Sequence, residues 1–208
     1  MSQIPEPTKG RLLYLMRVLE KTGTKQLTSH QIEALTGWSS FTVRKDVSYL
    51  DGNYGGTVQG YEPAPLIQAI KKTLGLETRR RFCVVGLGRL GSAYLNFHAF
   101  HLGEFELVAG FDISVNRVEI LKSPVPLYPA YKMAEIIRRF SIEIALLCVP
   151  GEAAQGVAEK LAAAGIRGIL NFAPVILTLD GEITVRNVYV VDELRALSIN
   201  LQPPQDFQ

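Results

Sequence analysis

The spacing of hydrophobic residues changes near residue 80 of this 208-residue chain. Before that point, apolar residues recur at the three- and four-residue intervals of short amphipathic helices. After it, compact runs rich in Val, Ile and Leu alternate with helical stretches. The change predicts a helical domain over residues 1–78, an α/β domain over residues 79–191, and a last helix with a tail over residues 192–208.

The first domain is predicted to contain a helix-turn-helix at residues 28–50. Thr28 and Gln31 have the spacing of a capping box at the start of one helix, and Gly37 stands where a glycine would end it. A short connection then leads to a second helix. An earlier helix is indicated by an apolar face made of Leu12, Leu15, Met16 and Leu19.

The second helix of this motif has the residue types of a DNA-recognition helix. Its apolar face holds Val43, Val47 and Leu50, and its other faces are polar. Such a helix enters the major groove, where Arg44 suits a guanine edge and Lys45 suits a phosphate. An ordinary helical hairpin with a charged outer face would show a similar pattern. The predicted DNA-facing residues are Ser40, Thr42, Arg44, Lys45, Ser48 and Tyr49.

A glycine-rich stretch, DGNYGGTVQGYEP, follows the helix-turn-helix. Its glycines alternate with Tyr54, Val58 and Tyr61, which predicts a β-hairpin with a Gly-rich tip. A helix-turn-helix followed by such a hairpin is a winged helix. One more helix, at residues 65–76, and the linker LETRRR complete the first domain.

The apolar runs after residue 81 predict a doubly wound parallel sheet. Near-continuous apolar strands suit a sheet that is buried on both faces. Helices are expected at residues 89–101, 132–140 and 152–164, and a short helix, DELRALSINL, follows the last strand. The predicted strands are FCVVGLG, ELVAGFD, IEIALLCVP, IRGILNFAP and ITVRNVYVV.

The stretch CVVGLGRLGSA has the Gly-x-Gly-x-x-Gly spacing of a dinucleotide-binding loop between a strand and a helix. Gly86 allows the tight turn, Gly88 lets a pyrophosphate approach the backbone, and Gly91 permits close packing of the helix on the strand. The helix N-terminus offers N–H groups to the phosphates. The alternative is a tight turn without a ligand.

Asp112 supports the cofactor interpretation, because it ends the next predicted strand 21 residues after Gly91. An acidic residue at this distance binds the ribose 2′-hydroxyl of NAD, whereas a 2′-phosphate would be repelled. No arginine follows Asp112 directly. The pattern therefore favours NADH and NAD⁺ over the phosphorylated dinucleotides.

The sequence offers this cofactor no catalytic partner. Hydride transfer needs a substrate pocket and usually a general acid or base, but the predicted sheet uses the chain up to about residue 191. His30 lies in the helix-turn-helix, and His98 and His101 lie on the helix behind the Gly loop. No metal-binding or catalytic-triad motif is present. We therefore expect a cofactor-binding protein that is not an enzyme and holds no metal.

Composition and charge add two expectations. Residues 1–81 hold 12 Lys/Arg and 7 Asp/Glu, while residues 82–208 hold 10 and 13, and a basic first part suggests a polyanionic partner. The chain has no apolar run of about 20 residues and no signal-peptide pattern, so we expect a cytoplasmic protein without a membrane span. Cys83 and Cys148 sit in apolar runs and are expected to be buried thiols.

Together these features resemble the Rex family of bacterial redox-sensing transcriptional repressors, in which a winged helix precedes an NAD-type Rossmann domain. The resemblance runs from about Ile4 to Leu201. The stretches that carry it are IPEPTKGRLLYLMRVLE, TVRKDVSYL, VVGLGRLGSA, FDI, VPGEAAQ and GIRGILNFAPV.

The resemblance implies a homodimer that binds a palindromic operator in double-stranded DNA, with NAD⁺ permitting binding and NADH releasing the DNA. It also implies that the last helix crosses into the partner subunit. Arg17, Phe97 and Tyr189 take the positions of an interdomain and dimer switch. The residues expected to bind or border the cofactor are Gly86, Leu87, Gly88, Arg89, Leu90, Gly91, Asp112, Val149, Pro150, Asn171, Phe172, Ala173 and Pro174.

Three features depart from the family pattern. The predicted wing lacks a basic residue before its glycines, and Phe97 stands where the family often has Tyr. Tyr189 stands where a carboxylate is expected on the last strand, so a contact between subunits would have to be rebuilt, for example through Asp192.

Two other functions stay open. One is a small enzyme that binds NAD(H) or CoA, either an oxidoreductase or a CoA-ligase-type fragment; a ligase of that kind needs a histidine after His101, and none follows. The other is a sensor that has lost DNA binding, which the wing without basic residues would favour.

Overall fold

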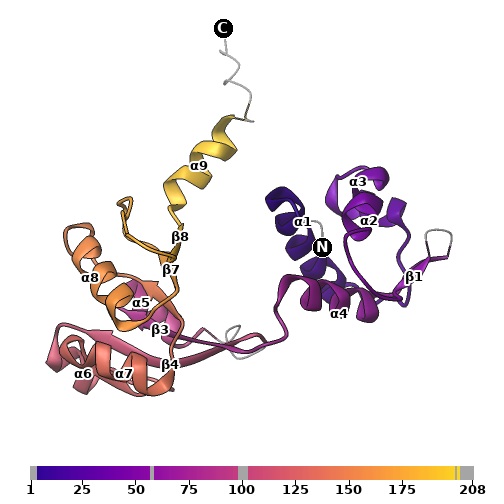
Figure 1. The fold of residues 1–208 in the computed structure, drawn as a ribbon. Coiled ribbons are helices and arrows are strands. Elements are labelled where there is room, and N and C mark those ends of the chain that lie inside the picture. The colour runs from indigo at the N-terminus through magenta and orange to yellow at the C-terminus, as the bar shows by residue number, and fades with distance from the viewer. Residues whose placement is uncertain (1–3, 57–58, 98–102, 200, 202–208) are drawn as a thin grey trace, which may run out of the picture. The chain divides into compact units, whose positions relative to one another are not determined.

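The structure is a computed structural model of the chain, and it describes residues 4–56, 59–97, 103–199 and 201. Two compact units are present, Met1–Thr78 and Arg79–Gln208 (Figure 1). None of the helices in the described ranges combines the length and the apolar character that a membrane crossing requires.

The first unit is a winged helix, as the sequence predicts. Its two short strands pair antiparallel, and Tyr61 also bridges to Leu27. Residues 57–58, at the predicted tip of the wing, lie outside the described residues. The elements are α1 (Glu6–Lys21), α2 (Ser29–Thr36), α3 (Ser40–Val47), β1 (Gly55–Gly56), β2 (Gly60–Tyr61) and α4 (Pro63–Leu74).

Local signals fix the helix boundaries in this unit. The Thr28 hydroxyl accepts the Gln31 N–H, and the Gln31 side chain accepts the Thr28 N–H at 2.8 Å, which completes the capping box. Gly37 ends α2 in the left-handed conformation, with φ of 74°. The predicted apolar faces of α1 and α3 meet in one core. That core includes Leu12, Leu15, Leu19, Ile32, Val43, Val47, Leu50 and Leu66.

The second unit is a Rossmann domain with a six-stranded sheet in the order β5-β4-β3-β6-β7-β8. All neighbouring strands pair in parallel. The order reverses between β3 and β6, as in a doubly wound sheet. The strands are β3 (Arg80–Val85), β4 (Phe105–Asp112), β5 (Leu127–Pro129), β6 (Ile144–Leu147), β7 (Gly168–Asn171) and β8 (Thr184–Asn187).

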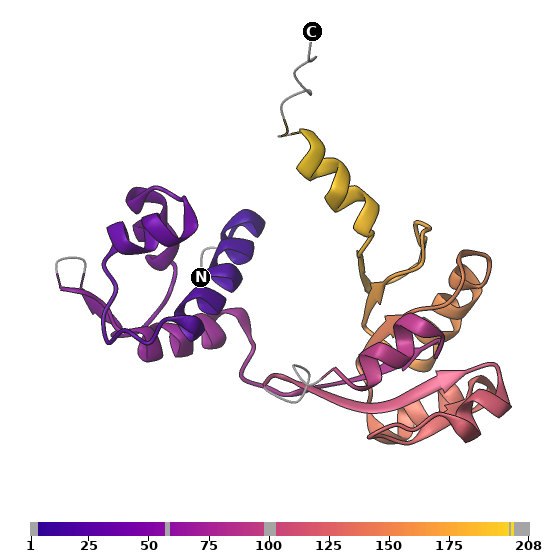
Figure 2. The ribbon, with the colours of Figure 1, turned by 180° about the vertical axis from the view of Figure 1, so that it is seen from behind.

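The helices of this unit divide the core between the two faces of the sheet. Side chains of α7 and α8 pack with Phe111 and Leu147 on one face. Leu95 of α5 packs with Phe82 and Val84 on the other. The last helix, yellow in Figures 1 and 2, follows β8. The helices are α5 (Arg89–Leu95), α6 (Val115–Ile120), η2 (Ala130–Lys132, a 3₁₀ turn), α7 (Met133–Phe140), α8 (Gly151–Ala164) and α9 (Val190–Ile199).

The predicted last strand is wrong in its second half. β8 ends at Asn187 and α9 begins at Val190, so Tyr189 lies between strand and helix, and the expected domain end at residue 191 falls inside α9. A short apolar run such as VYVV does not distinguish strand from helix by its pattern. The helix is favoured here because Asp192 and Glu193 stand in its first turn, where acidic side chains stabilise a helix N-terminus.

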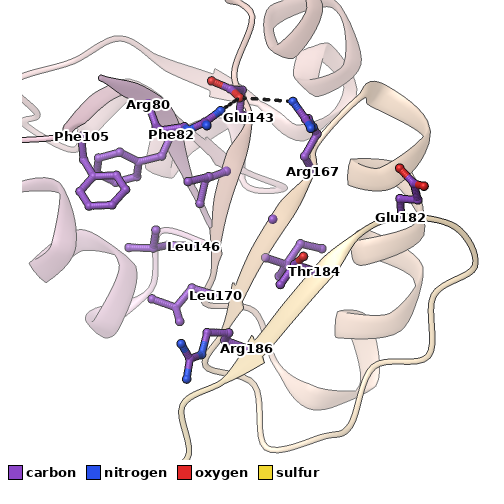
Figure 3. Close-up of a pocket in the computed structure, with 13 residues that line it drawn as sticks. Arg80, Phe82, Phe105, Glu143, Leu146, Arg167, Leu170, Glu182, Thr184 and Arg186 are labelled. Atoms are coloured by element: carbon purple, nitrogen blue, oxygen red, sulfur yellow. Dashed lines mark hydrogen bonds and ion pairs between the residues drawn. The ribbon is translucent and has the colours of Figure 1, made fainter. Parts of the chain in front are cut away.

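The sheet face opposite α7 and α8 has an open hollow over β6, β7 and β8, with a volume of about 560 Å³. Figure 3 shows Leu146, Leu170 and Thr184 pointing into this hollow. At its rim, Glu143 pairs with Arg80 at 2.5 Å and with Arg167 at 3.8 Å. A largely apolar sheet face thus stays uncovered in a single copy of the described chain.

Candidate cofactor pocket and nucleic-acid interface

A larger hollow of about 1200 Å³ lies at the carboxyl ends of the strands where the strand order reverses. Dinucleotides bind at this switch point in doubly wound sheets. The predicted residues that line the hollow are Gly86, Gly88, Arg89, Leu90, Asp112, Val149, Pro150 and Phe172.

The three glycines of the loop have different physical roles. Gly86 has a φ of 90°, and a Cβ there would lie 2.7 Å from the Cys148 carbonyl oxygen. A Cβ on Gly91 would overlap the Gly86 carbonyl oxygen. A Cβ on Gly88 would meet no protein atom within 4 Å. The fold therefore requires Gly86 and Gly91, whereas Gly88 leaves open space in the pocket, as close approach of a pyrophosphate needs.

Asp112 is buried at the end of β4, and its carboxylate is held by three donors. Oδ2 accepts the Leu87 N–H at 2.7 Å, and Oδ1 accepts the Ser114 N–H at 2.8 Å. Nη1 of Arg117 lies 3.1 Å from Oδ1 and 3.0 Å from Oδ2. Although no arginine follows Asp112 directly in the sequence, helix α6 brings Arg117 back to it. The sequence interpretation missed this contact because it did not predict α6.

Part of the predicted cofactor set does not line the pocket. Leu87 and Gly91 are buried beneath the loop. The amide of Asn171 is fully engaged in the structure, donating to Val175 O and Asn187 Oδ1 and accepting the Ala173 N–H. Of the stretch from Asn171 to Pro174, Phe172 alone is among the lining residues, while Asn171 holds the loop in place.

The pocket is more cationic than the sequence pattern suggests. Arg117, Arg138 and Lys160 line it together with Arg89, and among the described lining residues only Asp112 is acidic. Cations in a cleft attract an anionic ligand through the summed field. Phe172 is supported from behind by Tyr94, whose ring centroid lies 4.9 Å away. These features fit a ligand with two phosphates better than a neutral one.

Both cysteines are predicted to be chemically silent. Burial raises the pKa of the Cys83 thiol strongly and raises that of Cys148, which borders the pocket, to about 12. Because the thiolate is the reactive form, both thiols stay protonated near neutral pH. We expect neither to react with Ellman's reagent in the folded protein and both to react in denaturant. Rapid labelling of Cys148 in the folded state would contradict this.

Helix α3, the predicted recognition helix, presents one exposed stripe. Ser39 caps it by accepting the Thr42 N–H at 3.2 Å. Phe41, Lys45 and Ser48 are exposed at i, i+4 and i+7, and Phe41 is 67% exposed. The sequence interpretation missed Phe41, although its spacing to Lys45 placed it on the same face.

The other predicted DNA-facing residues are half-buried. Arg44 donates from Nη1 to the Ser29 hydroxyl at 3.1 Å, at the N-terminus of α2. The Ser40 N–H donates to Glu33 at 2.9 Å. Thr42 and Tyr49 also stay partly accessible. To contact a base edge, as the sequence predicts, Arg44 would have to release Ser29 or share it.

Lysines from three helices gather beside α3. Lys9 of α1, Lys45 of α3 and Lys72 of α4 line one hollow of about 990 Å³, which Ser48 and Tyr49 also border. The overall charge bias of the first unit is smaller than predicted. Residues 1–78 hold nine Lys/Arg and seven Asp/Glu, because the arginines of the expected linker belong to the second unit. The positive charge of this unit is therefore local, and it is partly offset by Asp51, which also lines the hollow, and by Glu6, which pairs with Lys9.

An ion pair with a buried carboxylate and a half-buried arginine links α3 to α1. The Asp46 carboxylate accepts from Arg11 Nε at 2.5 Å and Arg11 Nη2 at 2.7 Å. The Thr8 hydroxyl donates to Asp46 at 3.0 Å. Asp46 is 3% exposed, and its bond to Arg11 raises the pKa of the guanidinium. The sequence interpretation placed no role on this residue.

The predicted switch residues lie in both units. Arg17 is exposed on α1, and Phe97 and Tyr189 are exposed in the second unit. Phe97 meets Tyr94 edge to face with ring centroids 6.4 Å apart. Asp192, the suggested substitute carboxylate, pairs with Arg195 at 2.8 Å. The switch assignment stays a prediction.

Within the described ranges, no three His, Cys, Asp or Glu side chains are grouped as a metal site. His98 and His101 lie outside those ranges.

Both units of the chain match known protein families. Residues 3–48 match the family model of a putative DNA-binding protein N-terminus, and residues 77–175 match that of a CoA binding domain. The redox-sensing transcriptional repressor Rex of Thermus thermophilus is 38% identical over 98% of this chain and 96% of its own length.

Two solved structures are similar over nearly the whole chain. RSP in complex with β-NAD⁺ and operator DNA has a TM-score of 0.85 at 30% identity, covering 95% of this chain and 92% of RSP. RSP in complex with β-NADH has a TM-score of 0.83 at 27% identity, covering 95% and 94%. The chain therefore belongs to the Rex family of redox-sensing transcriptional repressors.

Proposed function

We propose that this protein is a transcriptional repressor that binds a palindromic operator as a homodimer and leaves the DNA when NADH binds. The observation that carries the proposal is that one chain combines a winged helix with a pocket around Gly88. The fold itself does not require a glycine at position 88, but a glycine there keeps the pocket open. The complexes of the related RSP with NAD⁺ and operator DNA, and with NADH, support it.

In this proposal NADH and NAD⁺ bind in the pocket at the carboxyl ends of the strands. When bound, the cofactor supplies a nicotinamide in its reduced or oxidised form. Gly86, Gly88 and Arg89 hold the pyrophosphate, and Asp112 binds the adenosine ribose. Val149, Pro150 and Phe172 border the rest of the cofactor. Leu87, Gly91, Asn171 and Ala173 hold the loops in position from outside the pocket.

On DNA, the exposed stripe of α3 enters the major groove. Phe41 suits the methyl group of a thymine and Arg44 suits a guanine. Lys45 and Ser48 suit phosphates, and the lysines of the neighbouring hollow extend that contact. These roles distinguish base-reading residues from residues that only position the helix.

We propose no catalytic step for this protein. Hydride transfer needs a group that exchanges protons near the nicotinamide. The described lining includes Tyr131 and Lys160 besides Asp112 and Cys148, so the proposal rests on the related proteins, which are repressors, and not on the absence of such a group. A repressor of bacterial genes acts on the chromosome, which places the proposed function in the cytoplasm.

Two uncovered apolar surfaces support the homodimer. Val190, Leu194, Leu197 and Leu201 follow at i, i+4, i+7 and i+11, and each is at least 57% exposed. The open face over β6, β7 and β8 is the second surface. Exposed apolar patches of this kind mark protein interfaces. We propose that α9 crosses into the partner subunit.

Replacing Leu194 and Leu197 together by glutamate is expected to give a monomer. Two charges on the apolar stripe cannot be buried without a large desolvation cost. The variant should run at half the mass in light scattering and bind a palindrome at least tenfold more weakly, because each half-site is then bound separately. Replacing Glu193 by glutamine, on the same helix, serves as the control. A dimeric double variant would contradict the role of α9.

The proposed function is tested by fluorescence anisotropy with a palindrome selected from random DNA. NADH is expected to weaken DNA binding at concentrations where NAD⁺ does not. CoA is a control ligand, because part of the chain matches a CoA binding domain. If NADH and NAD⁺ affect DNA binding identically, the protein is not a sensor of the NADH/NAD⁺ ratio. If no palindrome is selected even at low salt, where phosphate contacts are strongest, it is not an operator-binding repressor.

A further inference from the structure

The ribose end of the pocket holds a pair of opposite charges instead of a lone carboxylate. Asp112 is 4% exposed, whereas the Arg117 side chain is 48% exposed, and both line the pocket. The buried member is fixed by two backbone N–H groups, from Leu87 and Ser114. The exposed member is the one that is free to turn toward a ligand.

The Asp112 carboxylate has no acceptor position left over. Two oxygens offer about four lone-pair directions, and two backbone N–H groups and Arg117 Nη1, which faces both oxygens, take them. A ribose hydroxyl that donates to Asp112 must therefore displace Arg117. Among the described residues, only Asp112 accepts from the guanidinium, so Arg117 keeps most of its five donors for a ligand.

We propose that Arg117 is a specificity-determining residue. It can bind a ribose 2′-phosphate, and its ion pair with Asp112 weakens that binding. The inference rests on the proposed binding of NAD(H). A guanidinium matches phosphate geometry and binds it through charge-assisted hydrogen bonds. Arg117 alone would thus favour NADPH, Asp112 alone would favour NADH, and the pair gives a weaker preference for NADH than a lone carboxylate gives.

The test compares NADH and NADPH binding by their intrinsic fluorescence, without DNA, in a set of variants. In Asp112→Asn the amide oxygen can still accept the Leu87 N–H, but the NH2 group replaces the oxygen that accepts the Ser114 N–H, and the charge is gone. We expect its NADH affinity to fall roughly tenfold or more and its NADPH affinity to rise roughly tenfold. Asp112→Ser, with more room for a phosphate, is the second variant if the first does not fold.

The complementary variant is Arg117→Met, which keeps the length of the side chain and removes its charge. It is expected to bind NADPH roughly tenfold more weakly and NADH more tightly, because the ribose no longer displaces the guanidinium. If the NADH affinity rises while the NADPH affinity falls, Arg117 contacts the ligand; a purely structural role of Arg117 would change both affinities in the same direction. The double variant Asp112→Asn/Arg117→Met should lose the gain in NADPH affinity.

Three results would overturn the inference. One is equal weakening of both ligands by Arg117→Met, which would make Arg117 a support for Asp112 only. Another is a gain in NADPH affinity that persists in the double variant. The third is no gain in either Asp112 variant while the unaltered protein binds NADH. Failure of the unaltered protein to bind NADH would instead overturn the proposed function.

Discussion

Replacing Gly91 by alanine is expected to lower the free energy of unfolding of the Rossmann unit by about 3 kcal/mol and to abolish NADH binding. The added methyl group would overlap the carbonyl oxygen of Gly86, which is backbone and cannot turn aside. Overpacking of a tight site typically costs ~1–3 kcal/mol, and the upper end applies where no side chain can yield. The loop must shift, and the phosphate site shifts with it.

The chain offers a spectroscopic control for this variant. Its single tryptophan, Trp38, packs against the core of the first unit. In urea, tryptophan fluorescence therefore reports on the winged helix, while circular dichroism reports on both units. The Gly91 variant should shift the circular dichroism transition and leave the fluorescence transition in place.

Gly88→Ala is the matched variant, because the new methyl group would meet no protein atom within 4 Å. It should keep the stability of the unaltered protein and still weaken NADH binding, since its methyl group occupies pocket space. If the Gly88 and Gly91 variants destabilise the Rossmann unit equally, the division of roles among the glycines is wrong.

The elements that the sequence predicted well are those with strong local signals. The Thr28–Gln31 capping box, the Gly37 helix end and the Gly loop each depend on residues close together in the chain. The alternation of strands and helices gave the Rossmann domain, because buried parallel strands are apolar throughout. The sequence stretches that resemble the Rex family predict the same two-domain architecture.

Except for Phe41, whose spacing to Lys45 was visible in the sequence, the misses depend on contacts between distant residues or on ambiguous short segments. Helix α6 has only six residues and buries none of them, so the sequence pattern did not indicate a helix there, and the contact of Arg117 with Asp112 was not predicted. The roles of Asn171 and Asp46 depend on bonds across 16 and 35 residues. Their burial, and not their residue type, distinguishes them from ordinary polar side chains.

Asp46→Ala is expected to lower the free energy of unfolding of the first unit by about 3 kcal/mol, because removing one partner of a buried ion pair leaves the other without compensation. Arg11 keeps 30% of its side-chain surface exposed, which limits the loss. Here the Trp38 fluorescence transition should move to lower urea concentration while the Rossmann transition stays. DNA binding should weaken as well, because the pair fixes recognition helix α3 against α1.

A double-mutant cycle separates the ion pair from general damage to the core. Arg11→Met removes the guanidinium and keeps much of its apolar length, and Asp46→Ala/Arg11→Met removes both charges. If the pair acts as a unit, the double variant is less destabilised than the sum of the single ones, by roughly 1–3 kcal/mol of coupling energy. Thr8→Val loses only one hydroxyl and should cost about 1 kcal/mol. Additive single effects would mean that Arg11 and Asp46 do not stabilise the unit as a pair, and that the loss in Asp46→Ala comes from its other contacts, such as the bond from Thr8.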